Sequence, residues 1–389
     1  MEILTEKIDL NNLDKSNWET FKFDEIAQKI SKTIDPNETT LETYIGLEHI
    51  DAGDLHIRRK GSPDDVKGGK LRCYPGDIIF GKRRAYQRKA AIVDFDGICS
   101  AHAFVLRANS EVIDSKLFPF FLHSDQFMHR MVDISVGGLS PTINWGDLKH
   151  QEFLLPPKDQ QAQLAKLLWA MDEIIEREKE VLGSVELKIK STQKMLFSKV
   201  NYPRIKLNKY STILGGYAFS SKSFINEGVP VIKIKNIVKG EILVDDDSNY
   251  ITPDVLNLDK YVLSQGDILI AMTGATLGKI GVVQNKYDGA FLNQRVGKFQ
   301  MKKGIDRWFM KGVLDSEYFL NELNKYIGEG AQGNISSEDV SKTLVPNLSE
   351  SEMSDFGQKF ESLYNSIKSL GNKISSSKSL QKSLINQIF

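Results

Sequence analysis

The sequence is built from two copies of one unit of roughly 190 residues, and this duplication limits the chain to folds that are made twice. YIGLEHIDAGDL (44–55) matches VIKIKNIVKGEI (231–242) in its apolar positions and its glycine, at an offset of 187 residues. PGDIIF (75–80) matches QGDILI (265–270), and residues 158–197 match 350–389 at an offset of 192. Chance likeness of common strand patterns is the alternative, but so small a drift over three blocks favours duplication.

Composition removes several classes of protein. With 389 residues, 41% hydrophobic and 26% charged, the chain is ordinary globular protein long enough for two or three folding units. Lys plus Arg (51) equals Asp plus Glu (51), so a strongly basic whole-chain nucleic-acid binder is excluded and any such role must be local. Two cysteines, Cys73 and Cys99, cannot form a disulfide framework or a four-cysteine zinc site. The start has no apolar signal segment and no run is long enough to span a membrane, so we expect a soluble protein of a reducing compartment.

Within each copy the pattern changes once, from short strands to one long helix. Short apolar runs such as 77–80, 90–93 and 104–106 lie between Gly, Pro and Asp residues, which predicts a mixed, sheet-containing domain. Pro156 and Pro157 close this part, because proline stops a continuing helix but suits the start of a new one. The following stretch to Val200 has no proline and one glycine, so we expect a helix there.

Both long helices carry apolar residues in heptad steps of four and three, which is the pattern of a coiled coil. Glu178 and Thr192 interrupt the first stripe, and Ser377 and Gln381 interrupt the second. Because a globular domain separates the helices, we expect an antiparallel intramolecular pair, about 60 Å long. The alternative, in which each helix packs only on its own domain, would give a wider and less regular stripe. The predicted seam residues are Leu164, Leu168, Met171, Ile175, Leu182, Ile189, Phe356, Phe360, Leu363, Ile367, Ile374 and Leu384.

We therefore expect an α+β fold with a pseudo-twofold internal repeat, in which two similar mixed α/β domains are separated by two long antiparallel helices forming a coiled coil. The expected parts are a segment 1–17 that packs beside the C-terminal helix or is a loose end, a first domain 18–157, a first helix 158–200, a second domain 201–348 and a second helix 349–389.

The segment 81–89 concentrates positive charge that the chain as a whole does not have. It holds five cations, no acid and one aromatic residue between two predicted strands, and Lys67, Lys70 and Arg72 precede it. Arginine forks suit phosphates and guanine edges, so this loop is a candidate for DNA contact, although a plain solvated basic loop would have a similar composition.

The matching loop of the second copy has a different character. Residues 271–279 offer hydroxyls, glycines and one lysine, which favours close backbone approach instead of a charge cluster. Further on, Asn293 and Gln294 suit adenine and Arg295 suits guanine. One framework with two sets of polar residues is expected of modules that read different sequences, but neutral drift in exposed loops would also produce it.

No motif for chemistry is recognisable. Gly278-Lys279 lacks the spacing of a phosphate-binding loop, and Ile280 stands where that loop needs Ser or Thr. All six histidines lie in the first copy, at spacings that match no zinc pattern, so we expect neither a metal site nor catalytic residues.

Taken together, these segments resemble a type I restriction-modification DNA specificity subunit over nearly the whole chain. The most specific pieces are PGDIIFGKRRAYQRKAAIV with DGICSAHAFVLR in copy one and QGDILIAMTGATLGKIGVV with GAFLNQRVGKFQ in copy two. INWGDL, leading into FLLPP at 153–157, resembles the family's junction into the spacer helix. Copy two departs there, because VPNL (345–348) lacks the double proline, which leaves the start of the second helix open.

The resemblance implies a prokaryotic, cytoplasmic subunit that does no chemistry. Each domain would be a target-recognition domain that reads one half of a bipartite double-stranded DNA target, while the helices fix the spacing and dock two modification subunits. Those partners would bind S-adenosylmethionine and methylate adenine, and restriction subunits that use ATP and Mg²⁺ could join. This chain would bind no cofactor and no metal.

Carried over to this sequence, the resemblance assigns DNA contact to the two loops and, more weakly, to 293–295. The candidates are Lys70, Lys82, Arg83, Arg84, Tyr86, Arg88, Lys89, Thr273, Gly274, Thr276, Lys279, Asn293, Gln294 and Arg295. Three other functions remain open on the residues alone: an unrecognised DNA-modifying enzyme, a stand-alone two-module DNA-binding regulator, and an interaction scaffold. Activity of the chain alone would indicate the first, and tight DNA binding without partners the second.

Overall fold

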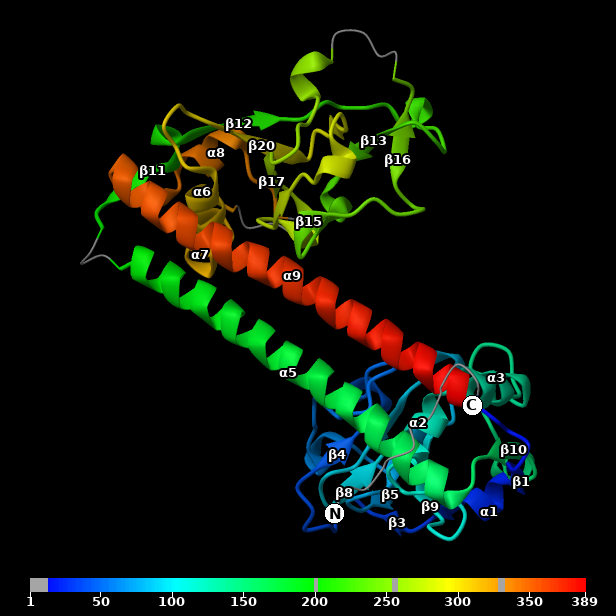
Figure 1. Ribbon diagram of the computed structural model, residues 1–389. Coiled ribbons are helices and arrows are strands. Elements are labelled where there is room, and N and C mark those ends of the chain that lie inside the picture. The colour runs from blue at the N-terminus through cyan, green and yellow to red at the C-terminus, as the bar shows by residue number, and fades with distance from the viewer. Residues whose placement is uncertain (1–12, 199–201, 254–257, 328–332) are drawn as a thin grey trace, which may run out of the picture. The chain divides into compact units, whose positions relative to one another are not determined.

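The computed structural model describes residues 13–198, 202–253, 258–327 and 333–389. Its contacts divide the chain into two compact units: unit 1 runs through Lys179 and adds Asn372–Phe389, and unit 2 is Glu180–Gly371. Each unit therefore holds one sheet-containing domain and one part of each long helix (Figure 1). The boundaries predicted from the sequence treat each long helix as a part separate from the domains. Those boundaries remain a prediction.

Unit 1 contains two four-stranded sheets and a two-stranded ladder. The first sheet has the order β2-β9-β6-β7, from β2 (Ala27–Ile30), β9 (Ala103–Ala108), β6 (Ile78–Gly81) and β7 (Ala90–Ile92), all antiparallel. The second has the order β3-β5-β8-β4, from β3 (Thr33–Ile34), β5 (Lys70–Cys73), β8 (Gly97–Cys99) and β4 (Tyr44–Ile45). The ladder pairs β1 (Glu19–Lys22) with β10 (Glu152–Leu155). Short helices are α1 (Phe23–Ile26), α2 (Phe118–His123), α3 (Asp125–Asp133) and α4 (Trp145–Leu148).

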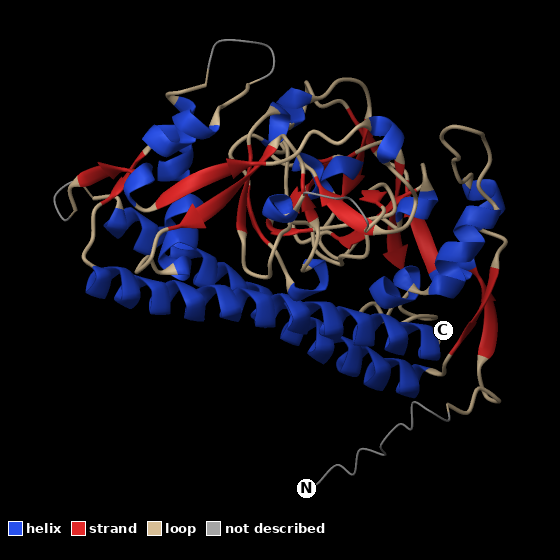
Figure 2. Cartoon of the chain, turned by 90° about the horizontal axis from the view of Figure 1, so that it is seen from above, coloured by secondary structure: helices blue, strands red, loops and turns tan. Residues whose placement is uncertain are grey.

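Unit 2 repeats this plan with a longer first sheet. Its order is β12-β20-β17-β18-β15-β14, from β12 (Ser211–Gly215), β20 (Val296–Met301), β17 (Ile268–Ala271), β18 (Ile280–Val282), β15 (Gly240–Ile242) and β14 (Ile237–Val238). A second sheet has the order β16-β13-β19, from β16 (Asn249–Ile251), β13 (Val229–Ile232) and β19 (Phe291–Leu292), and β11 (Arg204–Lys206) pairs with β21 (Leu344–Pro346). Its short helices are α6 (Arg307–Leu314), α7 (Glu317–Asn324) and α8 (Ser337–Lys342), shown with the strands in Figure 2.

The shared strand order confirms the duplication predicted from the sequence. β2-β9-β6-β7 corresponds to β12-β20-β17-β18, strand for strand along the chain. The repeated Gly-Asp before the central strand has the same role twice. Asp77, fully buried, is held by both guanidinium arms of Arg107 (Nε–Oδ1 2.7 Å), and Asp267 lies 3.0 Å from Lys298 Nζ. A carboxylate withdrawn from water needs such a partner, and each copy supplies one, Arg107 for the buried Asp77 and Lys298 for the half-buried Asp267.

The core of unit 1 is unusually aromatic. Phe121 lies 5.2 Å from Phe127 and 5.1 Å from Phe153, ring centre to ring centre, and Phe389 packs on it at 5.3 Å. Ser124 begins α3 by accepting a hydrogen bond from the amide of Phe127, which sets this helix against the cluster. Phe389, which follows α9, is therefore partly buried against the core of the first domain.

Both predicted long helices are present, as α5 (Lys158–Leu196) and α9 (Glu350–Ile388). Neither stripe contains an exposed residue: all ten heptad positions from Leu164 to Leu196 and all ten from Phe356 to Ile388 are buried or half-buried. In unit 1, Leu164 and Leu168 share a cluster with Ile385 and Ile388, so rising numbers on α5 meet falling numbers on α9. In unit 2, the end of α5 and the start of α9 lie in one cluster. The antiparallel helix pair predicted from the heptads is confirmed.

The amino-terminal segment is only partly described. Leu13 packs against the cluster that contains Ile385 and Ile388 of α9, and residues 1–12 lie outside the described part. Among the described helices, none is long and apolar enough to cross a membrane.

Candidate nucleic-acid interface

The basic segment 81–89 forms the connection between β6 and β7, as its predicted position between two strands requires. Its middle is a single 3-10 turn, Ala85–Gln87, bounded by Arg84 (φ 56°) and Arg88 (φ 53°) in the left-handed region. Side chains with a Cβ rarely adopt that conformation, and of the described residues only one other non-glycine, Lys239, has a positive φ. Ala85, 2% exposed, fixes the turn to the core. A strained backbone held by its surroundings is typical of a functional loop.

The structure divides the five cations of this loop into two groups. Arg88 forms an ion pair with Asp125 at the start of α3, and Asp125 also exchanges hydrogen bonds with Asn386 of α9 (2.7 and 2.6 Å). Lys89 donates to the carbonyl of Leu47 at 2.6 Å. These two side chains hold the loop to the domain, a use that the charge of the segment alone did not indicate.

The other candidates in the loop are turned to the outside or half-covered. Arg84 and Tyr86 are exposed, and Tyr86 is 54% exposed. Arg83 is half-buried, and among the described residues no carboxylate pairs with it. Lys82 lies over the ring of Phe104 at 5.2 Å, where burial lowers the pKa of its ammonium group and the charge of Lys29 adds to that effect. Arg83, Arg84 and Tyr86 are therefore the side chains best placed to reach a ligand.

Lys70 is not brought to this loop by any contact in the described part of the chain. It begins β5, in the second sheet, and its ammonium group donates to the carbonyls of Lys67 and Gly68 in its own turn. The side chain of Lys70 therefore stabilises its own turn and does not extend the basic loop.

A hairpin of residues 136–142, which the sequence did not single out, lies against the basic loop. Val136 and Thr142 exchange two backbone hydrogen bonds (3.0 and 2.9 Å) at its base. The amide of Arg84 donates to the carbonyl of Pro141 at 2.7 Å, and Arg84 Nε donates to Ser140 Oγ at 3.2 Å. The glycines at 137 and 138 and the proline at 141 were the available signal for a tight turn here.

In unit 2 the loop after β17 has the same neighbour at the same place. Gly274 (φ 74°) donates its amide to the carbonyl of Gly333, as Arg84 does to Pro141. Thr273 is half-buried and Lys279 is exposed, whereas the hydroxyl oxygen of Thr276 is buried and has no hydrogen-bond partner among the described residues. Thr273, Gly274 and Lys279 remain candidates, but the hydroxyl of Thr276 does not reach the surface as expected.

Residues 293–295 also divide into two roles. Asn293 is 8% exposed and its Oδ1 accepts the amide of Arg295 at 3.4 Å, so it holds the turn. Gln294 and Arg295 are exposed, and together with Thr273 and Asn334 they line a concavity of about 560 Å³. Three segments that are far apart in the sequence therefore form one polar surface in unit 2.

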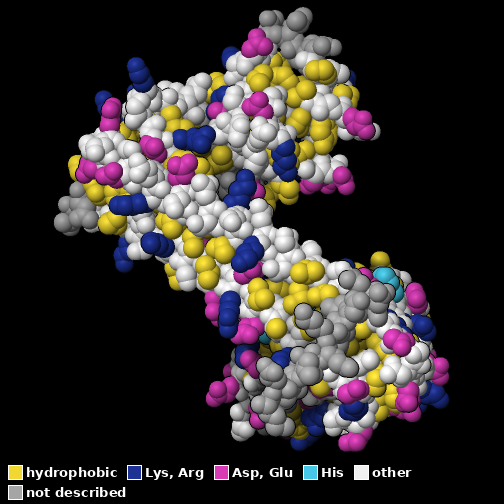
Figure 3. Space-filling model, in the orientation of Figure 1, with side chains coloured by type: hydrophobic (Ala, Val, Ile, Leu, Met, Phe, Trp, Pro, Cys, Tyr) yellow, Lys and Arg dark blue, Asp and Glu magenta, His cyan; other side chains and the backbone are white. Residues whose placement is uncertain are grey.

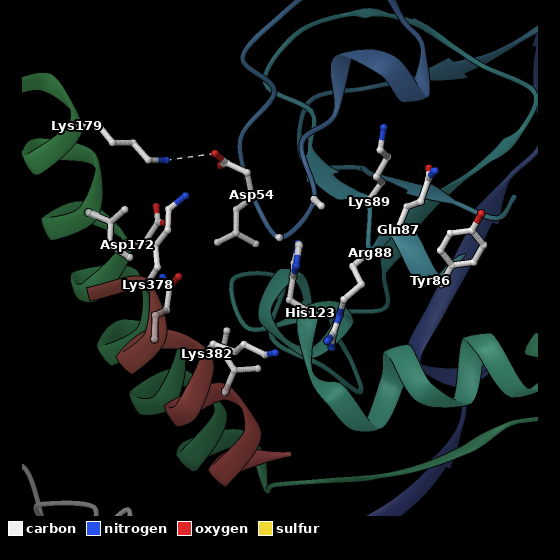
Figure 4. Close-up of a pocket in the computed structure, with 16 residues that line it drawn as sticks. Asp54, Tyr86, Gln87, Arg88, Lys89, His123, Asp172, Lys179, Lys378 and Lys382 are labelled. Carbon is white, nitrogen blue, oxygen red and sulfur yellow. Dashed lines mark hydrogen bonds and ion pairs between the residues drawn. The ribbon is translucent and has the colours of Figure 1, made fainter. Parts of the chain in front are cut away.

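A cavity of about 540 Å³ in unit 1 lies between the domain and the two helices. Arg88 and Lys89 reach it from the basic loop, and Lys378 and Lys382 from α9 (Figure 4). His123 also borders it; burial lowers the pKa of its imidazole, and its Nε2 lies 2.9 Å from the carbonyl oxygen of Ala90.

Beside this cavity, the segment 54–58 is joined to α5 by a row of ion pairs. Arg58 contacts Glu176 with both arms (2.5 and 2.7 Å) and also Asp54 at 3.0 Å, and Lys179 Nζ lies 3.2 Å from Asp54. Burial is the largest single effect and would raise the pKa of the two carboxyl groups. The hydrogen bonds from Arg58 act together with the positive charges of Arg58 and Lys179 and with further hydrogen bonds, and jointly they lower both pKa values to about 2. This row fixes the first domain to its helix and leaves the basic loop on the far side of the cavity.

Elsewhere the surface charge is mixed. On the face drawn in Figure 3, Lys and Arg side chains alternate with Asp and Glu over both units, which agrees with the zero net charge of the sequence. In the part of the chain that the structure describes, no group of three or more His, Cys, Asp or Glu residues could hold a metal ion. Electrostatic attraction for a polyanion must come from local groups such as Arg83 and Arg84.

Comparison with known proteins places both units in one family. The family model for the type I restriction modification DNA specificity domain matches twice, at residues 15–187 and 201–373. The chain is 28% identical over 278 residues to the type I restriction enzyme MjaVIII specificity subunit of Methanocaldococcus jannaschii, covering 65% of this chain and 61% of that protein. It is 28% identical over 168 residues to the EcoDI specificity subunit of Escherichia coli, covering 42% of this chain and 37% of that protein. The chain thus matches less than two thirds of the length of these relatives.

Solved structures agree on the fold. The type I restriction-modification system S subunit from M. genitalium superposes with a TM-score of 0.61 over 97% of this chain and 98% of that chain, at 16% identity. A chain from a study of complex assembly and conformational transition of the type I R-M system gives 0.55 over 95% and 97%, at 17% identity. Since the family model covers most of the sequence in two matches, the chain belongs to the family of type I restriction modification DNA specificity proteins and carries the specificity domain twice.

Proposed function

We propose that this chain is the DNA specificity subunit of a type I restriction-modification complex. Each unit's domain reads one half of a bipartite target in double-stranded DNA. The long helices set the distance between the half-sites and dock two modification subunits, which methylate adenine. The chain itself performs no catalysis.

One observation carries this proposal: the two units share a strand order but present different side chains at the same place. The loop after β6 offers Arg83, Arg84 and Tyr86, and the loop after β17 offers Thr273 beside Gln294 and Arg295. Arginine suits phosphates and guanine, while hydroxyl and amide groups make short contacts to base edges. Two copies of one framework with unlike contact residues suit an asymmetric target.

The helices support the spacing and docking roles. A continuous helix of 39 residues, as both α5 and α9 are, is about 58 Å long, which exceeds one DNA turn of about 34 Å. Beyond the seam, α5 exposes Leu167 (37%), Ile174 (52%) and Val181 (50%), which are spaced by seven residues. An exposed apolar stripe at heptad spacing is suited to receive a partner helix, and we assign it to the modification subunits.

We infer from this proposed division of labour that the cofactors belong to the partner subunits. S-adenosylmethionine would be bound by the modification subunits, and ATP and Mg²⁺ by restriction subunits where these are present.

The proposal is tested by co-expressing this chain with the modification subunit of its host system in cells without endogenous adenine methylation and sequencing the methylated bases. The expected result is one bipartite adenine motif that needs both proteins. Methylation by this chain with S-adenosylmethionine alone would show an enzyme instead. A stable complex that leaves no methylated motif would contradict the specificity role.

A further inference from the structure

The most exposed large apolar side chain among the described residues is Leu139, at the tip of the hairpin 136–142. It is 96% exposed, and Val136 at the base of the hairpin is 65% exposed. A single exposed leucine is ordinary on a protein surface, so its exposure alone means little. The position of this leucine is what needs an explanation.

The hairpin is held firmly where it joins the domain. Two backbone hydrogen bonds connect Val136 and Thr142, and Thr142 Oγ1 donates to the carbonyl of Ser140 at 3.1 Å. The amide of Ile143, which is 1% exposed, donates to the carbonyl of Lys82 at 2.9 Å. Gly137 has a φ of 118°, which lets the chain reverse without a side chain in the way. The structure thus holds the leucine on a short, braced support, clear of the core.

The surroundings of the tip identify the kind of molecule that would cover it. Arg84 is hydrogen bonded to the hairpin through both its amide and its Nε, and Arg83 forms an isolated bridge with Thr142. An apolar tip with the guanidinium group of Arg84 beside it, and a second arginine at its base, is complementary to an anionic surface with an apolar interior. Duplex DNA has that composition, with phosphates outside and stacked bases inside.

We propose that Leu139 is a DNA wedge: it inserts at a base step of the first half-site and partly unstacks it, while Arg83 and Arg84 hold the adjacent phosphates. This inference rests on the function proposed above and adds a specificity mechanism to it. A wedge makes binding depend on how easily a step unstacks, so pyrimidine-purine steps are favoured at a position that no hydrogen bond reads.

The test uses the assembled complex with its modification subunits and duplexes that carry 2-aminopurine at successive positions of the first half-site. Wild-type complex is expected to raise 2-aminopurine fluorescence at one step. Leu139→Ala and Leu139→Ser should abolish this rise and weaken binding by about tenfold, whereas Leu139→Met should keep both. Val132→Ala, at an exposed apolar residue of α3 (42% exposed), is the matched control and should behave as wild type.

The outcomes separate this inference from the proposed function. If wild-type complex binds the duplex specifically but no position brightens and Leu139→Ala binds equally well, the wedge is wrong and the specificity role stands. If Leu139→Ala reduces assembly with the modification subunits at unchanged DNA affinity, the tip is a protein contact and the wedge is again wrong. If the wild-type complex has no sequence preference in DNA, the proposed function itself fails.

Discussion

Glu178 Oε1 lies 3.3 Å from Lys373 Nζ, at the point where the apolar stripe of α5 is interrupted. The two partners are unequally covered, because the side chain of Glu178 is 6% exposed and that of Lys373 is 67% exposed. Neither carboxylate oxygen has a hydrogen-bond partner among the described residues. Removing this carboxylate from water costs free energy, and an exposed lysine offsets only part of that cost. Glu178 therefore lowers the stability of the helix pair.

Replacing Glu178 by Leu should therefore stabilise the helix pair by about 1–3 kcal/mol, because a buried charge is exchanged for an apolar side chain that continues the stripe. Thermal unfolding of the purified chain measures this. Lys373→Met is the informative counterpart, because it leaves the carboxylate without its partner and should lower the midpoint. A lower midpoint for Glu178→Leu would show that the ion pair stabilises the seam.

His56 gives the first unit a pH-dependent connection to α5. Its Nε2 lies 2.7 Å from Asp172 Oδ2, and this hydrogen bond raises the pKa of the imidazole above its ordinary value of 6.5 despite partial burial. The stabilisation is fully present below 6.5 and is lost as pH rises through the raised pKa. His56→Gln should lower the unfolding midpoint clearly at about pH 5.5 and much less at about pH 9. His150→Gln, at an exposed residue, is the control, and an equal effect of His56→Gln at both pH values would contradict this assignment.

The two groups of cations in segment 81–89 should respond differently to substitution. Arg83→Ala with Arg84→Ala should weaken binding of the assembled complex to its target and reduce the slope of log Kd against log salt by up to about 2, at an unchanged unfolding midpoint. Arg88→Ala removes the ion pair with Asp125 and should lower the midpoint. Titrations at several salt concentrations beside thermal melts distinguish the two. Unchanged affinity in the double variant would remove the loop from the interface.

In the second unit, substitutions at the exposed Arg295 and at the buried Asn293 should also have different effects, the first on DNA binding and the second on stability. Arg295→Ala is expected to relax the base preference in one half-site, at a cost of about 1–3 kcal/mol in discrimination, and to leave folding unchanged. Asn293→Ala should destabilise the unit, because the buried amide holds the turn. Competition binding with single-base variants of the target measures the first effect. A uniform loss on all sequences would make Arg295 a phosphate contact.

The parts of the fold that depend on local periodicity were predictable from the sequence, and those that depend on distant partners were not. The heptads predicted both helices and the buried side of each, because a 3.5-residue repeat is a property of one segment. The role of Arg88 depends on Asp125, 37 residues away, and the left-handed backbone that points it there leaves no mark in the sequence. The burial that distinguishes Asn293 from Arg295 likewise depends on a distant strand, because the amide of Asn293 donates to the carbonyl of Ile232.

The hairpin 136–142 was missed for a different physical reason. Its hydrogen bonds are made by backbone groups, and its position beside Arg84 follows from the pairing of segments more than fifty residues apart. The glycines and proline of this segment indicate a turn, but they do not indicate that the turn packs against the loop 81–89.

The central claim is that each unit reads its own half of one target. It is tested most directly by replacing the contact residues of one unit at a time with alanine. Variants with alanine at Arg83 and Arg84, or at Gln294 and Arg295, are each co-expressed with the modification subunit, and methylated adenines are mapped across the genome. The account predicts that the first pair alters or loses specificity in one half of the motif only, that the second pair does so in the other half, and that the spacing stays fixed. A change in both halves from either pair, or in neither half from both pairs, would contradict it.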